Sequence, residues 1–171
     1  MNGARHPILR LLFGNLILLT VAAQSNHYLA RWQVHLWLGG LLVAPAALSV
    51  RHRAGAWAVF LAGLALDATT PVPFGTQALV LLAGHALAYT WRDRLARSEA
   101  SSQVMAAFTL NLGAFLVLAV VEAWTAPRVA GQFGRLLADL FASQLALILI
   151  GPWFCALQGC LLNPTGRREP V

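Results

Sequence analysis

Six apolar stretches separated by short polar connections constrain this chain more than any other feature of its sequence. Most of them approach the roughly 20 residues that an α-helix needs to cross a hydrocarbon core of about 30 Å. Only 11% of the 171 residues are charged, compared with about a quarter in soluble domains. We therefore expect an all-α, polytopic membrane bundle that forms a single domain over residues 1–171. The predicted spans are 7–23, 34–50, 54–66, 74–91, 103–124 and 136–162.

The third stretch, 54–66, is short for a crossing helix, and a re-entrant or tilted segment is the alternative interpretation. Residues 67–73 leave room only for a tight turn before the fourth stretch, which favours a helical hairpin. A span that stops short of the interface tends to be buried among longer ones. Because Ala54, Ala58 and Ala62 recur at helical spacing, we expect a small-faced helix suited to the centre of the bundle.

The arginines indicate the orientation, because Lys and Arg are retained in short loops on the cytoplasmic side of a membrane. With six spans and a cytoplasmic N-terminus, nine of the 12 basic residues lie in the cytoplasm and three lie outside. The three outside are Arg31, Arg128 and Arg135, and the nine inside are Arg5, Arg10, Arg51, Arg53, Arg92, Arg94, Arg97, Arg167 and Arg168. If the third stretch did not cross, the later clusters would change sides. The charge pattern thus favours six spans with both chain ends in the cytoplasm.

The N-terminus shares some features with a secretory signal. Two arginines precede an apolar run, and Val21, Ala22 and Ala23 could form a small-residue cleavage site. Asn15 in the middle of the run is atypical of a signal core, so we interpret the stretch as the first span. Signal cleavage is the alternative interpretation.

The residues able to carry chemistry do not form a recognisable catalytic or metal site. The sequence has no phosphate-binding glycine loop, nucleophile elbow or paired-carboxylate motif, and its five histidines have no metal-ligand spacing. Cys155 and Cys160 point to different faces of one helix, which argues against a disulfide. The net charge of +6 comes without a basic stripe with interleaved aromatic residues, so nucleic-acid binding is not expected. We expect no catalytic residue, cofactor or metal, and a non-enzymatic role.

Four polar side chains fall at depth within the predicted spans, namely Asn15, His85, Asn111 and Gln144. Such groups are costly in lipid and usually face protein or a wet cavity. One interpretation is a substrate or proton pathway. The other, which we favour, is interhelical hydrogen bonds that stabilise the bundle by about 0.6–2 kcal/mol each. We favour it because no second ionisable residue accompanies His85 at mid-depth.

Asp67 ends the third stretch, where the helix dipole disfavours a carboxylate, so a compensating partner is expected. The local interpretation is a turn in which the carboxylate accepts backbone N–H bonds from Thr69 or Thr70. The alternative is an ion pair with one of the three arginines predicted to lie outside, or with a second protein.

The segment 63–94 resembles the most recognisable part of the rod-shape-determining MreD family of bacterial inner-membrane proteins. The resemblance rests on a Gly-Leu start, an Asp at the span end, a Pro/Gly-bearing turn, an Ala-Leu pair and an Ala-Tyr before a basic loop. These positions are Gly63, Leu64, Asp67, Pro73, Gly75, Ala78, Leu79, Ala88, Tyr89, Arg92 and Arg94. Pro152 and Trp153 are similar to the Pro-Trp of that family's last span. The basic helical tail that often follows in the family is absent, since Asn163 and Pro164 stop the helix here.

The resemblance implies a non-enzymatic scaffold of the machinery that elongates the lateral cell wall, located in the bacterial inner membrane. It implies an MreC-like single-span protein as the direct partner. MreB-like filaments, a glycan polymerase and a penicillin-binding transpeptidase are the indirect partners that it implies.

The second hypothesis is the substrate-binding subunit of an energy-coupling-factor transporter for a vitamin or a metal ion, because those subunits are also small six-span proteins. A polar cavity around the four intramembrane polar residues would favour the transporter subunit. An interior filled by side chains would favour the scaffold.

Overall fold

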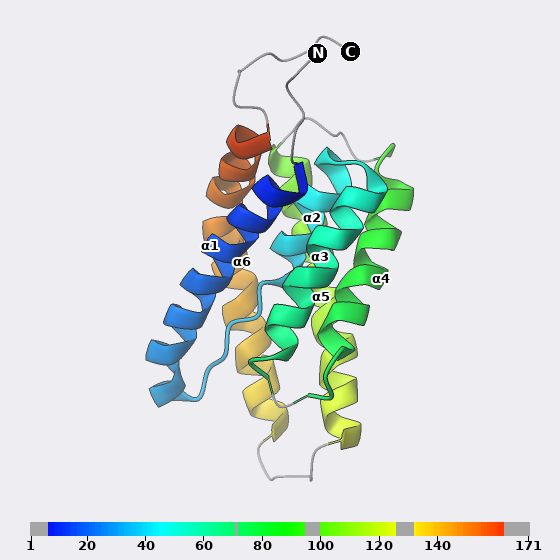
Figure 1. The fold of residues 1–171 in the computed structure, drawn as a ribbon. Coiled ribbons are helices and arrows are strands. Elements are labelled where there is room, and N and C mark those ends of the chain that lie inside the picture. Colours follow the sequence, from blue (N-terminus) through cyan, green and yellow to red (C-terminus); the bar gives the residue numbers. More distant parts are fainter. Residues whose placement is uncertain (1–6, 71, 95–99, 126–131, 163–171) are drawn as a thin grey trace, which may run out of the picture.

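The computed structural model describes residues 7–70, 72–94, 100–125 and 132–162, and every regular element in these ranges is a helix. The elements are α1 (Pro7–Leu29), the short 3₁₀ helix η1 (Ala30–Trp32), α2 (Gly39–Ser49), α3 (His52–Asp67), α4 (Thr76–Trp91), α5 (Ala100–Thr125) and α6 (Gln132–Leu162). These α-helices run alternately up and down in one bundle (Figure 1). The prediction of an all-helical fold is confirmed.

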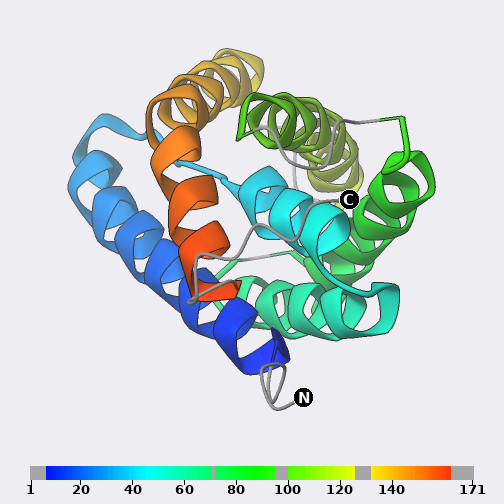
Figure 2. The same cartoon turned by 90° about the horizontal axis from the view of Figure 1, so that it is seen from above.

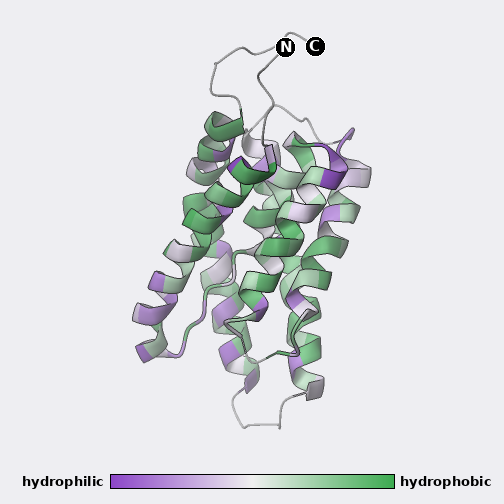
Figure 3. Cartoon of the chain, viewed as in Figure 1, coloured by the Kyte–Doolittle hydropathy of each residue, from purple (hydrophilic) through white to green (hydrophobic). Residues whose placement is uncertain are grey.

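The surface of the bundle has the character of a membrane protein. Within the described ranges, three helices are long and apolar enough to cross a membrane, namely Pro7–Trp32, Ser101–Thr125 and Gln132–Leu162. Large apolar side chains lie exposed on their outer faces, with Trp124 on α5 at 87% and Trp153 on α6 at 79%. Figure 3 shows that hydrophobic residues dominate the middle of the bundle, whereas hydrophilic residues gather toward its two ends. Lipid is the solvent in which such an exposed apolar surface is stable.

The centre of the bundle is occupied by α2, whose residues 39–48 are all buried. Figure 2 shows the other five helices arranged around it. Its glycines permit this close packing, because a Cβ on Gly40 would collide with the backbone carbonyl of Ala107 on α5. We predicted the third stretch at this position, and that prediction is wrong. α3 exposes Trp57 and Leu61 along one face, whereas α2 is apolar and covered on every side.

The second span was predicted to be helical from residue 34, but α2 begins only at Gly39. The chain leaves η1 through Gln33, which has a left-handed φ of 57°, and residues 34–38 form no helix. Hydropathy alone cannot distinguish an apolar helix from an apolar non-helical segment, which is the reason for the error. The helices α1 and α6 extend beyond their predicted spans because they continue into polar residues at the end of the bundle.

The third stretch is a helix, α3, that packs most extensively against α4, so the predicted helical hairpin is confirmed. Gly63 lies at a close approach of the two helices. A Cβ added there would come within 2.5 Å of the Cα and 3.0 Å of the backbone N of Ala78 on α4. Any side chain at residue 63 would therefore force the two backbones apart.

We expect Gly63→Ala to destabilise the protein by about 1–3 kcal/mol, the usual cost of overpacking, although alanine is the better helix former. Gly113→Ala is the matched control, because Gly113 is exposed on α5 and an added Cβ would meet no atom within 4 Å. Thermal unfolding in mild detergent measures both variants. A Gly63→Ala variant as stable as Gly113→Ala would contradict the close approach of α3 and α4.

Candidate functional site

The α3–α4 hairpin is closed by Asp67, the last residue of α3, which is only 3% exposed. Its two carboxylate oxygens accept hydrogen bonds from the backbone N–H groups of Gln77, at 2.8 Å, and Ala78, at 3.1 Å. Both N–H groups belong to the first turn of α4, where the helix itself provides no acceptor. The carboxylate therefore caps the next helix and lies at the positive end of that helix dipole.

The local prediction for Asp67 was wrong, because the backbone N–H of Thr69 donates to the carbonyl of Leu66 at 3.0 Å. The hydroxyls of Thr69 and Thr70 donate to the same carbonyl, at 2.9 and 3.2 Å. Arg128 lies outside the described residues, and a contact with a second protein stays a prediction. Within the described residues Asp67 forms no ion pair with an arginine. Gly75, with φ of 94°, turns the chain so that the start of α4 returns to the carboxylate, an arrangement that neither the local turn nor the ion-pair interpretation had included.

The non-helical segment 33–38 is anchored to α6 by two side chains. The backbone N–H of His35 donates to Oδ1 of Asp139 at 2.7 Å, and the backbone N–H of Trp37 donates to Oγ of Ser143 at 2.9 Å. Outside a helix, backbone groups at membrane depth are tolerated only where protein or water satisfies them. Asp139 and Ser143 thus replace the acceptors that a continuous helix would have provided.

Two asparagines complete this support from other helices. Oδ1 of Asn26 on α1 accepts the N–H of Leu36 at 2.7 Å, and its Nδ2 donates to the carbonyl of Leu36 at 3.0 Å. Oδ1 of Asn111 on α5 accepts the N–H of Gly40, in the first turn of α2, at 3.0 Å. The break before α2 is therefore held by α1, α5 and α6 together.

Trp37 links the same segment to the α3–α4 hairpin. Its indole Nε1 donates to Oε1 of Gln77 at 3.0 Å, and Nε2 of Gln77 donates to the hydroxyl of Thr70 at 2.6 Å. Trp37 and Gln77 are 5% and 2% exposed. A chain of hydrogen bonds therefore joins the segment before α2 to the α3–α4 turn.

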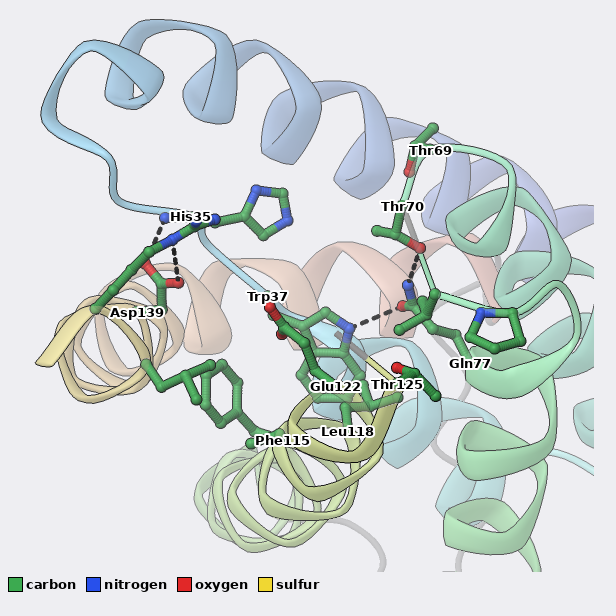
Figure 4. A pocket seen from close by; sticks show the side chains of 15 residues that line it. His35, Trp37, Thr69, Thr70, Gln77, Phe115, Leu118, Glu122, Thr125 and Asp139 are labelled. Carbon is green, nitrogen blue, oxygen red and sulfur yellow. Dashed lines mark hydrogen bonds and ion pairs between the residues drawn. The ribbon is translucent and has the colours of Figure 1, made fainter. Parts of the chain in front are cut away.

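A pocket of about 670 Å³ opens beside Trp37, Gln77 and Thr70, at the end of the bundle where α3, α5 and η1 end. Figure 4 shows the side chains that line it, which come from the segment before α2, the α3–α4 turn, α5 and α6. The polar and aromatic lining residues are His35, Trp37, Thr69, Thr70, Gln77, Phe115, Glu122, Thr125, Arg135 and Asp139. Its volume falls in the range of about 300–1,000 Å³ that is typical of small-molecule sites.

The charged groups of the pocket differ in how they are compensated. Nε of Arg135 lies 3.9 Å from Oδ2 of Asp139, and its side chain is 61% exposed. Glu122, near the end of α5, is half-buried and forms no hydrogen bond or ion pair within the described residues. No group of three His, Cys, Asp or Glu side chains in the described ranges could hold a metal ion.

The four predicted intramembrane polar residues are not brought together, and none of them lines the pocket. Asn15 accepts a hydrogen bond from Nε2 of Gln158 at 3.1 Å, which joins α1 to α6. Asn111 holds the start of α2, as described above. The amide of Gln144 is buried without a hydrogen-bond partner among the described residues. For Asn15 and Asn111, the observed contacts are the interhelical hydrogen bonds that we favoured.

His85 has a neighbour that the sequence argument missed. Its Nε2 lies 3.3 Å from the carbonyl oxygen of His52, and the two rings stack with centroids 5.3 Å apart. Tyr89 packs against His52 at 4.6 Å, and the guanidinium of Arg92 lies 4.5 Å from the centre of the Tyr89 ring. His52 is 33 residues away in sequence, so no spacing rule on one helix could find this pair.

The remaining motif residues fall at different places. Pro73 lines the pocket, and its carbonyl accepts the N–H of Thr76 at 3.1 Å. Gly75, in the Pro/Gly-bearing turn, has a positive φ of 94°, which glycine adopts readily. Pro152 and Trp153 lie on the exposed face of α6, and neither lines the pocket.

Comparison with known proteins was made by sequence and by structure. No family model, curated protein or solved structure matches this chain.

We expect Asp67→Ala to cost about 2 kcal/mol or more, because two buried N–H groups lose their acceptor. Asp67→Asn retains one acceptor oxygen, so its stability should lie between that of Asp67→Ala and that of the wild type. Thermal unfolding in detergent gives the order, and limited proteolysis at the α3–α4 turn reports whether α4 has loosened. An Asp67→Ala variant with unchanged unfolding temperature would contradict the capping role.

Proposed function

We propose that this protein is a non-enzymatic six-span scaffold of the bacterial inner membrane, acting in the machinery that elongates the lateral cell wall. In this proposal it binds an MreC-like single-span partner through its transmembrane helices. MreB-like filaments, a glycan polymerase and a penicillin-binding transpeptidase are indirect partners. The observation that carries the proposal is that segment 63–94, which resembles the MreD family, forms one closed hairpin beside the pocket.

The placement of the arginines supports six spans. Arg10, Arg51, Arg53, Arg92 and Arg94 lie at the end of the bundle where α1 begins and α6 ends, with Nη1 of Arg10 3.3 Å from the carbonyl of Leu162. Arg31 and Arg135 lie at the opposite end. The other five arginines fall outside the described residues. In the proposed topology the first group faces the cytoplasm.

The short helices fit this topology. α2 is 11 residues long. Its rise is roughly 17 Å, and the non-helical segment before it can add up to roughly 20 Å. Together they exceed the roughly 30 Å of a hydrocarbon core. α3 and α4, with 16 residues each, rise roughly 24 Å and are supported by the longer helices.

Single cysteines test the proposed topology in a Cys155→Ser, Cys160→Ser background, in which both free thiols are removed. A cysteine at Thr69 should react with an impermeant maleimide added outside intact spheroplasts. A cysteine at Arg53 should react only after lysis, and one at Gly113 should stay protected by lipid. Labelling of residues 69 and 53 from the same side would exclude the proposed six-span arrangement.

Depletion of the protein in its rod-shaped host tests the scaffold function. Cells should become round and lose their lateral pattern of wall synthesis, and re-expression of the wild-type chain should restore both. An MreC-like protein should co-purify from native membranes. Cells that keep their shape and wall-synthesis pattern after depletion would refute the scaffold proposal.

The pocket favours a second candidate, a substrate-binding subunit of an energy-coupling-factor transporter. Its supporting observation is the volume of about 670 Å³ at the proposed outer face, away from the four polar residues first considered. This candidate predicts that a vitamin or metal ion raises the unfolding temperature of the purified protein. A flat response across both ligand classes, together with rounding on depletion, would leave the scaffold as the function.

A further inference from the structure

We propose that the pocket binds a positively charged nitrogen carried on a small apolar body. The chemical class is an alkyl- or arylalkylammonium group, supplied by a small molecule or by a lysine side chain of a partner. The charges and walls of the pocket support this assignment by themselves, whichever of the two functions proposed above is correct.

The charged side chains of the pocket do not balance one another. Asp139 is already compensated, since its Oδ1 accepts the N–H of His35 and its Oδ2 faces Arg135. Glu122 has no such compensation within the described residues. It also lies in the last turn of α5, where the carbonyl ends of the helix add negative potential. The uncompensated charge of the pocket is therefore negative.

His35 does not cancel this charge. Nε2 of its imidazole lies 3.4 Å from Nδ2 of Asn26. Within the described residues the imidazole forms no ion pair with Glu122.

Aromatic and apolar side chains form much of the wall of the pocket. Trp37 and Phe115 are buried aromatic residues of the lining, and Leu118, Val72 and Pro73 add apolar surface. Figure 4 shows Glu122 extending from α5 into the space that these side chains border. A cation is attracted both by a carboxylate and by the face of an aromatic ring, and an apolar body fills the remaining volume.

The pocket is unsuited to an anionic ligand. An anionic ligand would require Arg135, which is mostly exposed and faces Asp139. It would also have to approach the unpaired carboxylate of Glu122. The pocket thus discriminates by repulsion as well as by attraction.

Three probes of one shape test the charge preference. Benzylammonium, benzyl alcohol and benzoate are titrated into the purified protein in non-ionic detergent, with calorimetry and thermal unfolding as readouts. Benzylammonium should bind at least about 10-fold more tightly than either other probe, as expected for a charge-assisted contact. Equal binding of benzoate or benzyl alcohol would overturn the proposal. So would a result in which neither benzylammonium nor the lysine peptide described below binds.

Variants assign the preference to the pocket. Glu122→Gln keeps the shape of the side chain and should remove the advantage of benzylammonium. Asp93→Asn, an exposed carboxylate at the other end of the bundle, should leave binding unchanged. Leu118→Trp fills the pocket and should abolish binding. If Glu122→Gln folds and binds benzylammonium as the wild type does, the proposal fails; if it does not fold, the wild-type probe series and Leu118→Trp decide.

A peptide pair identifies the source of the cation. Acetyl-Phe-Lys-Phe-amide is compared with its norleucine counterpart, which has a similar shape and no charge. Preference for the lysine peptide supports a partner side chain, whereas binding of benzylammonium without either peptide supports a small molecule. Loss of this binding would leave the depletion phenotype untouched, so the two proposals fail separately.

Discussion

Three consecutive backbone N–H groups, at residues 35–37, are paired by side chains of α1 and α6 instead of by a helix of their own. Leaving them unpaired in an apolar interior would cost several kcal/mol each. Because they are paired, α2 can begin deep in the bundle and be surrounded on every side. The same break turns the indole of Trp37 toward Gln77 and gives the pocket one of its walls.

The α3–α4 hairpin solves the same problem at a second place. Asp67 accepts two N–H groups at the start of α4, and Gly63 lets the two backbones approach. In both places the acceptor comes from a different element than the donors it satisfies. Polar side chains at these two places thus accept hydrogen bonds from backbone N–H groups. Glu122 differs, because it forms no hydrogen bond or ion pair among the described residues.

The sequence predicted the helical content, the hairpin and the use of Asn15 and Asn111 as interhelical contacts, because hydropathy and the cost of buried polar groups depend on local composition. It did not predict the non-helical stretch before α2, since an apolar helix and an apolar non-helical segment have the same hydropathy. Nor could it predict the Asp67 cap or the His52–His85 stack, which depend on how separate helices meet. Nothing in the sequence marked Trp37 or Gln77 as pocket residues. Glu122 was visible only as a carboxylate near the end of the predicted span 103–124.

The two places also differ in when they can form. Asp67 finds its partners 10 and 11 residues later, so the hairpin can close soon after α4 leaves the ribosome. His35 and Trp37 find theirs 104 and 106 residues later, on α6, the last of the described helices. Until α6 is in place, the N–H groups of these two residues lack the acceptors that they have in the folded bundle. A chain truncated before α6 would therefore leave the segment before α2 without its two anchors.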